Sequence, residues 1–447
     1  MKINQSISGY KQILLSFIIL LGSINGLAQN ETSTTLKKKI NIKSSADIQL
    51  NLYDITVNVR PSVNNEVRIE LEYMADGKEE DLDKLKELME SSILKGNSGG
   101  SEAVIDLAFQ NNFNLEIMGM KWSKVSLKSD KKQSIKLKEF KIKRCDIWLP
   151  EKSNIDVDAK YSKLEVKGNI EGNLRLNLYD TKSEFNEVSG NVTGDLKYSQ
   201  LAMASTNNVK LKLYESTLST KETKSLSLEA KYSKIATGET ASIDLNIYEG
   251  SFNGNDAQNV NIISKYANLN MRVAKQLYLE GYEGSFMFDD VEDLRVSAKY
   301  IEFVASRINS LELLEAYENE IKIQEVNKLK SKDGKYNEFT IGSLGKSLVH
   351  SGYEDEIEIE SVSSEFQKIE ITGKYTEIDM TLANPKAFIL SGKLQYPDLN
   401  ISEGKYVIRK KIKDDNNLEF NYEYGNVNDS SPQIVVNGYE MAVSINQ

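Results

Sequence analysis

The stretch KYSKLEVKGNIEGNLRLNLYD, residues 160–180, decides the fold. In LEV, residues 164–166, and in LRLNL, residues 174–178, apolar residues alternate with polar ones. Alternation with a period of two is typical of a β-strand that buries one face. The stretch therefore predicts a unit of two or three short strands joined by tight corners.

The tyrosines of this stretch belong to a series that recurs every 16 to 22 residues. Alternate members follow a lysine, and most of those between them precede an acid. Self-similarity at a fixed period is the signature of a stacked repeat architecture. The series is Tyr161, Tyr179, Tyr198, Tyr214, Tyr232, Tyr248, Tyr266, Tyr282, Tyr300, Tyr317, Tyr336, Tyr353, Tyr375 and Tyr396.

A repeat of about 17 residues with two or three strands is the length of one coil of a β-solenoid. We therefore predict an all-β chain with a single elongated parallel β-solenoid (β-helix), in which the tyrosines form one ladder with a spacing of about 4.8 Å per coil. Stacking like charges would be repulsive, so alternating lysine and acid flanks favour one register. A coil of about 34 residues with two separate tyrosine ladders is the alternative.

The ladder has two readings. Regularly spaced tyrosines in a stacked repeat pack ring on ring, and an exposed aromatic strip can also bind a glycan or a partner protein. The acids beside the tyrosines could be read as paired carboxylates of a glycoside hydrolase. Because they recur in nearly every second unit, we interpret them as part of the repeat; they are Asp180, Glu215, Glu249, Glu283, Glu318 and Glu354.

The amino terminus has the features of a secretory signal peptide over residues 1–28. Lys2 and Lys11 form a positively charged region before an apolar stretch, Ile13 to Leu21, and Gly26-Leu27-Ala28 forms a small-residue cleavage site. We therefore expect an exported protein of the periplasm, the outer surface or the extracellular space, with no transmembrane segment after cleavage.

Composition excludes several kinds of chemistry. The formal net charge of −10 argues against nucleic acid as a partner. The single cysteine, Cys145, cannot form an internal disulfide and is expected to be a buried structural thiol. The single histidine, His350, rules out a multi-histidine zinc site and is expected in a solvated loop. We predict no catalytic, cofactor-binding or metal-binding residue, and no cofactor.

The flanks of the repeat predict caps. Residues 29–150 contain two strands within 46–73, with a turn at 61–65, and an amphipathic helix over 79–94 that would cap the stack. A glycine and serine loop follows at 95–101. Residues 151–400 would hold the solenoid, and residues 401–447, with a hairpin-like EYGNVNDSSPQIVV, the second cap.

The sequence Ile147-Trp148-Leu149-Pro150, followed by IDVDAKYSKLEVKGNIEGNLRL, resembles a family of exported bacterial adhesin-like β-solenoid proteins of unknown function, common in the Bacteroidota. The resemblance covers about residues 40–400. Lys-Tyr-Ser and Tyr-Glu-Gly stand here where that family usually has Ser-Gly-Asp corners. The resemblance implies an envelope or surface role, with adhesion as one form of it, and supplies no catalytic residues.

Three functions remain open. A non-enzymatic envelope or surface protein, acting as an adhesin-like scaffold or binding rod with a surface glycan or envelope protein as partner, comes first. A glycan-binding or polysaccharide-degrading β-helix comes second and would need an interrupted repeat, best placed at residues 336–360. A passenger requiring an outer-membrane anchor comes third.

Overall fold

The computed structural model describes residues 33–109, 114–117, 120–122, 134–404 and 406–447. Strands dominate these residues, and helix α2 covers Glu79–Ser92. The all-β class and the helix expected near residue 79 are confirmed. The expected signal peptide lies outside the described residues.

The chain divides into two compact units. The described parts of the first are residues 33–38, 69–92, 109, 114–117, 120–122 and 134–145. This unit holds α2, most of β3 (Glu66–Gly77) and most of β8 (Ser134–Leu149). Leu85 and Met89 of α2 are buried, as the predicted apolar face requires, and so is Cys145. The role of α2 as a cap of the repeat stays a prediction.

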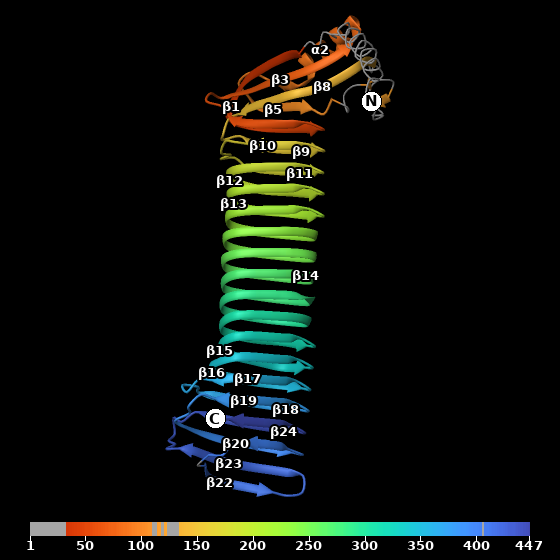
Figure 1. The fold of residues 1–447 in the computed structure, drawn as a ribbon. Coiled ribbons are helices and arrows are strands. Elements are labelled where there is room, and N and C mark those ends of the chain that lie inside the picture. The colour runs from red at the N-terminus through yellow and green to blue at the C-terminus, as the bar shows by residue number, and fades with distance from the viewer. Residues whose placement is uncertain (1–32, 110–113, 118–119, 123–133, 405) are drawn as a thin grey trace, which may run out of the picture. The chain divides into compact units, whose positions relative to one another are not determined.

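The second unit is built from strands that pair in parallel with the next stretch of chain. Gln200 lies opposite both Lys182 and Thr217, and Tyr214 lies opposite both Lys197 and Lys231. Figure 1 shows the ribbon winding in successive turns from β12 to β16. We call each turn a coil. The strands here are β12 (Lys182–Lys197), β13 (Gln200–Tyr214), β14 (Thr217–Tyr317), β15 (Glu320–Lys335) and β16 (Glu338–Tyr353).

One coil, residues 199–215, shows why the repeat has its length. Its inward residues alternate along two strands, and at three places two outward residues separate neighbouring inward ones, which turns the chain through a corner. Simple alternation fails at these corners. Strict alternation from Met271 would point Val273 inward, but Val273 is only half-buried and Ala274 is the buried residue. The inward residues of this coil are Ser199, Leu201, Met203, Thr206, Val209, Leu211 and Leu213.

Equivalent inward residues of successive coils lie on top of one another. Val192 is opposite Val209, which in turn is opposite Leu226, and all three are almost fully buried. A one-residue slip would move every inward side chain to the solvent face, so this core fixes the register.

The stack of coils begins before the predicted start at residue 151. β1 (Ser33–Tyr53) pairs in parallel with β9 (Asn154–Lys160), and β2 (Thr56–Pro61) pairs with β10 (Lys163–Val166). Residues 47–61 thus supply two strands of a coil with a corner at Asp54, rather than half of a long hairpin. On its other side β1 pairs with β5 (Gly100–Leu107), which forms a short hairpin with β4 (Leu94–Gly96), so the loop expected at 95–101 is confined to residues 97–99.

The C-terminal coils do not follow chain order. β24 (Gln433–Tyr439) pairs in parallel with both β18 (Lys368–Lys374) and β20 (Ala387–Gln395). β25 (Ala442–Asn446) likewise lies between β19 (Glu377–Leu382) and β21 (Asp398–Ile401). The prediction that residues 401–447 form only an end cap is therefore wrong, because their last part is an inserted coil.

Residues between the two C-terminal coils do form a hairpin. β22 (Tyr406–Lys413) pairs antiparallel with β23 (Asn417–Gly425), and β23 pairs antiparallel with β20. The expected hairpin at EYGNVNDSSPQIVV is wrong, because its second half runs parallel to its neighbours as β24.

Candidate functional site

The candidate site is a row of contacting tyrosines, which we call the tyrosine ladder. Consecutive rings lie 5.4 to 5.9 Å apart between centroids, with interplanar angles of 71° to 87°. All tyrosines of the predicted series belong to this single row, so the alternative of two separate ladders is wrong. In spatial order the ladder is Tyr53, Tyr161, Tyr179, Tyr198, Tyr214, Tyr232, Tyr248, Tyr266, Tyr282, Tyr300, Tyr317, Tyr336, Tyr353, Tyr375, Tyr439 and Tyr396.

The rungs alternate between two backbone positions. In one coil the tyrosine itself, Tyr198, occupies the left-handed corner, with a φ of 56°. In the next coil Glu215 occupies the left-handed corner, with a φ of 46°, and Tyr214 is the residue before it. The same alternation extends along the ladder. Left-handed tyrosines are Tyr161, Tyr198, Tyr232, Tyr266, Tyr300, Tyr336, Tyr375 and Tyr396, and left-handed acids are Asp54, Asp180, Glu215, Glu249, Glu283, Glu318, Glu354 and Glu440.

This alternation explains the two kinds of flanking sequence. If every tyrosine occupied the same position, identical rings would stack at about 4.8 Å. Shifting alternate rings by one residue lets them meet edge to face, which the ring quadrupole favours. A left-handed conformation costs an ordinary residue roughly 1–2 kcal/mol. Two ring contacts per tyrosine offset that cost.

The shift also separates charges. The residue before the corner is alternately tyrosine and lysine, because Tyr179 lies opposite Lys160 and Lys197. At the corner itself, acids alternate with tyrosines. Like charges are therefore two coils apart, which weakens their repulsion.

Many of the corners, although not those at Ala267 and Ile301, are held from inside by a buried polar residue. The Ser199 amide donates to Ser216 Oγ and the Ser216 amide donates to Ser233 Oγ, both at 3.1 Å. Further along the stack asparagines take this place, and the Asn319 amide donates to Asn337 Oδ1 at 3.1 Å. These bonds satisfy backbone groups that the tight corner would leave unpaired.

The ladder is packed and accessible at once. The left-handed tyrosines are 41% to 47% exposed, although each of their rings contacts its ladder neighbours. The rings thus present about half of their surface to solvent, and both sequence-based readings, packing and presentation, stay compatible with the geometry.

Acids beside the rungs change the tyrosine chemistry. A hydrogen bond to Glu318, followed by burial and the charge of Glu318, raises the pKa of Tyr317 to about 12. Glu354 and Glu440 raise the pKa of Tyr353 and Tyr439 to about 12 for the same reasons. The carboxylate accepts a hydrogen bond from the phenol hydroxyl, and its negative charge disfavours the negative charge of a phenolate beside it.

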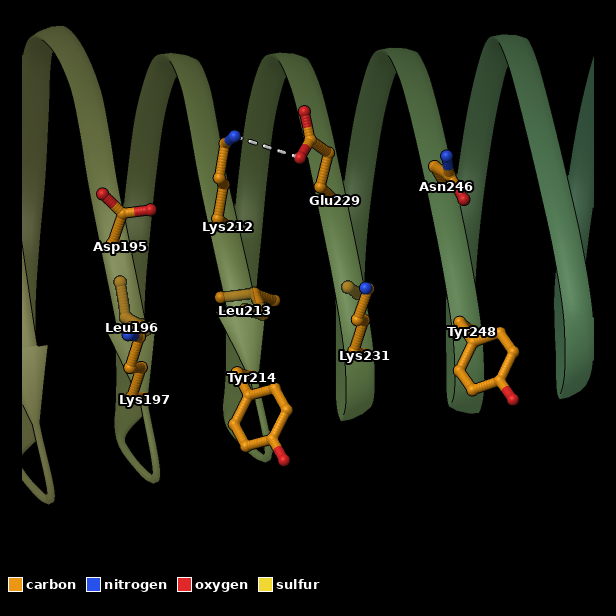
Figure 2. A pocket seen from close by; sticks show the side chains of 11 residues that line it. Asp195, Leu196, Lys197, Lys212, Leu213, Tyr214, Glu229, Lys231, Asn246 and Tyr248 are labelled. Atoms are coloured by element: carbon orange, nitrogen blue, oxygen red, sulfur yellow. Dashed lines mark ion pairs between the residues drawn. The ribbon is translucent and has the colours of Figure 1, made fainter.

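A shallow groove of about 350 Å³ runs beside the ladder. Figure 2 shows Tyr214 and Tyr248 at the same edge of two coils, with Lys231 on the coil between them. Lys212 and Glu229 form a 3.2 Å ion pair across the groove. The groove therefore combines aromatic rings with cations at regular spacing.

The prediction that His350 lies in a solvated loop is wrong. It is 2% exposed rather than solvated, and its Nε2 lies 3.1 Å from Asp355 Oδ2. Asp355 Oδ1 also accepts hydrogen bonds from the amide and side-chain nitrogens of Asn337, both at 2.8 Å. A β-carbon at Gly352 would lie 1.7 Å from Asp355 Oδ2, so only glycine leaves room for the pair.

The His350 site is sealed. Ser331 lies opposite His350 in the strand register and is fully buried. Serine, histidine and aspartate are the residue types of a hydrolase triad, but neither side chain of the His350–Asp355 pair is exposed to solvent. The irregularity expected at residues 336–360 is present only as two shifts in the register between β15 and β16, which remain paired, while β16 and β17 (Glu356–Val362) pair without a shift.

The described ranges contain no group of three or more His, Cys, Asp or Glu arranged to hold a metal ion. Within the same ranges, no helix combines the length and the apolar character that crossing a membrane demands.

Comparisons with known proteins identify no family for this chain. No protein-family model and no curated protein matches it. Among solved structures, it is similar to a putative cell adhesion protein from Clostridium sporogenes, at 10% identity and a TM-score of 0.15, covering 93% of this chain and 100% of that one. A TM-score this low carries no argument about fold or function.

Proposed function

We propose that the chain is an exported, non-enzymatic protein of the cell envelope or surface, in which a parallel β-solenoid of about 17-residue coils serves as an adhesin-like scaffold or binding rod. The observation that supports it most is the tyrosine ladder with its regular register. One repeated structure occupies most of the chain, and its most unusual surface feature is a continuous aromatic row. A surface glycan or an envelope protein is the proposed partner.

The alternation of tyrosine and lysine favours a glycan as the bound partner. Tyr214 and Tyr248 lie two coils apart, roughly 10 Å, with Lys231 between them. Aromatic rings stack against the apolar faces of sugars, and lysines pair with carboxylate or sulfate groups. An extended acidic polysaccharide, with sugar rings spaced like the coils, fits this pattern.

Polysaccharide cleavage is the weaker alternative. Glycoside hydrolysis needs two carboxyl groups that face one substrate bond. The corner acids instead recur on alternate coils, and Glu318, Glu354 and Glu440 hydrogen-bond the tyrosine beside them. The buried His350–Asp355 pair offers no approach to a polymer.

Retention of the full chain on surfaces coated with neutral or acidic glycans tests the binding proposal. A double variant, Lys197→Gln with Lys231→Gln, removes two cations of the groove and leaves the rings in place. We expect it to lose retention on acidic glycans, while Lys224→Gln, an exposed lysine outside the groove, retains it. Equal retention of all three proteins, or none by the unmodified chain, would contradict the proposal.

A further inference from the structure

The tyrosine ladder places phenols in an unbroken series of contacts. Tyr214 and Tyr232 are 5.7 Å apart, and Tyr232 and Tyr248 are 5.9 Å apart, between ring centroids. A ring that loses an electron therefore has a second phenol in contact on each side, except at the two ends of the row. This arrangement suits reactions between neighbouring tyrosines.

The same rings are open to an oxidant. Tyr232 is 45% exposed and Tyr198 is 44% exposed, so a reagent in solution reaches them. Proton acceptors also stand in place, because the Tyr214 and Tyr248 hydroxyls hydrogen-bond the carboxylates of Glu215 and Glu249. One-electron oxidation of a phenol releases a proton, and a hydrogen-bonded carboxylate can take it.

We propose that the tyrosine ladder is a site of oxidative cross-linking, at which a haem peroxidase using hydrogen peroxide joins neighbouring rings as dityrosine. This inference does not depend on the proposed binding function. Each bond would fasten one coil covalently to the next. An exported chain with a single cysteine has no internal disulfide for that purpose.

The reaction balances with peroxide as the oxidant. Two neighbouring phenols each lose one electron and one proton, and the two radicals form a carbon–carbon bond at positions ortho to the oxygens. The two ortho hydrogens then shift to the oxygens, which restores both aromatic rings. The two electrons and two protons reduce one hydrogen peroxide to two waters, so each bond lowers the protein mass by two hydrogens.

Tyr278 provides an internal comparison. Its side chain is 38% exposed, similar to the ladder rungs, but it lies outside the ladder and among the described residues no ring contact involves it. A radical on Tyr278 would have to meet a second molecule. Exposure alone would therefore give cross-links between molecules, whereas the ladder gives cross-links within one.

The test treats the full chain with a haem peroxidase and hydrogen peroxide, and reads dityrosine fluorescence, intact mass and cross-linked peptides. We expect monomers that lose hydrogens in pairs, with bonds between ladder neighbours such as Tyr214 and Tyr232, at a yield independent of protein concentration. Tyr232→Phe keeps the ring but removes the phenol, so the two bonds that involve residue 232 should vanish. Tyr278→Phe should leave the yield unchanged.

Three results would overturn the proposal. They are cross-links that form mainly between molecules and increase with concentration, cross-links that involve Tyr278 as often as the rungs, and no dityrosine while free tyrosine in the same reaction is coupled. Circular dichroism of Tyr232→Phe confirms that a lost bond reflects the missing phenol and not a lost fold.

Discussion

Tyr439 packs edge to face on Tyr375, with 5.5 Å between their ring centroids, although a coil and a hairpin separate them in sequence. Strands β24 and β25 thus lie between two coils that precede them in sequence, β18–β19 and β20–β21. Residues 387–401 reach their final neighbours only when residues 433–446 have been inserted beside them. The C-terminal segment is therefore expected to hold this end of the unit together.

Val436→Asp tests this dependence. Val436 is fully buried in β24, so an unpaired carboxylate there should destabilise the coil by several kcal/mol. Hydrogen exchange followed by mass spectrometry should show faster exchange in residues 368–382 and 387–401 as well as in β24. Gln433→Asp, at an exposed position of the same strand, is the control. Faster exchange confined to residues 433–446 would contradict the expected dependence.

The buried His350–Asp355 pair gives a second prediction. Asp355→Ala removes the acceptor of two Asn337 hydrogen bonds and leaves His350 without its partner, which should cost about 3 kcal/mol of unfolding free energy. Asp355→Asn retains an acceptor and should cost less. Urea unfolding followed by circular dichroism measures both, with the exposed Glu356→Ala as control. Equal stability of Asp355→Ala and Glu356→Ala would show that the buried network contributes nothing.

Ring packing in the ladder gives a third prediction. Tyr232→Ala removes contacts with Tyr214 and Tyr248 and should lower the unfolding free energy by about 1 to 3 kcal/mol. Tyr278→Ala, which removes a similarly exposed ring outside the ladder, should have a smaller effect. Thermal unfolding of the two variants side by side decides this. If both lose the same stability, ladder contacts do not stabilise the fold.

Alkaline pH should weaken the folded state. Tyr317, Tyr353 and Tyr439 have a pKa of about 12 in the folded chain, against 10.0 for an ordinary tyrosine. Between these values the unfolded chain has lost the phenolic protons that the folded chain still binds. Stability from these groups is therefore complete below pH 10 and falls as the pH rises towards 12.

Phenolate absorbance during an alkaline titration measures this shift. Glu318→Gln removes the charge beside Tyr317, so one tyrosine should then titrate at lower pH than in the unmodified chain. Glu325→Gln, an exposed carboxylate eight residues from the nearest rung in sequence, should leave the titration unaltered. An unchanged curve for Glu318→Gln would contradict the assigned cause.

Sequence alone predicted the strands and the rungs because both leave local periodic signals. Leu174, Leu176 and Leu178 alternate as a half-buried strand requires, and all three are buried. The inserted coil was missed because β24 finds its place through pairing with β18 and β20, and no period in the chain encodes that order. Tyr439-Glu440 repeats the rung pattern and was the available signal.

The His350 environment was missed for a related reason. Its neighbours in space, Ser331 and Asp355, belong to other coils or lie past a corner, so local polarity suggested a loop. The groove beside the ladder could not be foreseen either, since it depends on which position each tyrosine occupies at its corner.

The distance between two spin labels in the stack tests the central claim most directly. Lys197→Cys and Lys335→Cys, in a Cys145→Ala background, place labels at exposed positions before two corners. The ladder between these corners runs through eight successive ring contacts, so stacked coils predict roughly 38 Å by pulsed electron paramagnetic resonance. A distance of roughly 19 Å would instead mean coils of double length with half as many spacings, and would contradict the account.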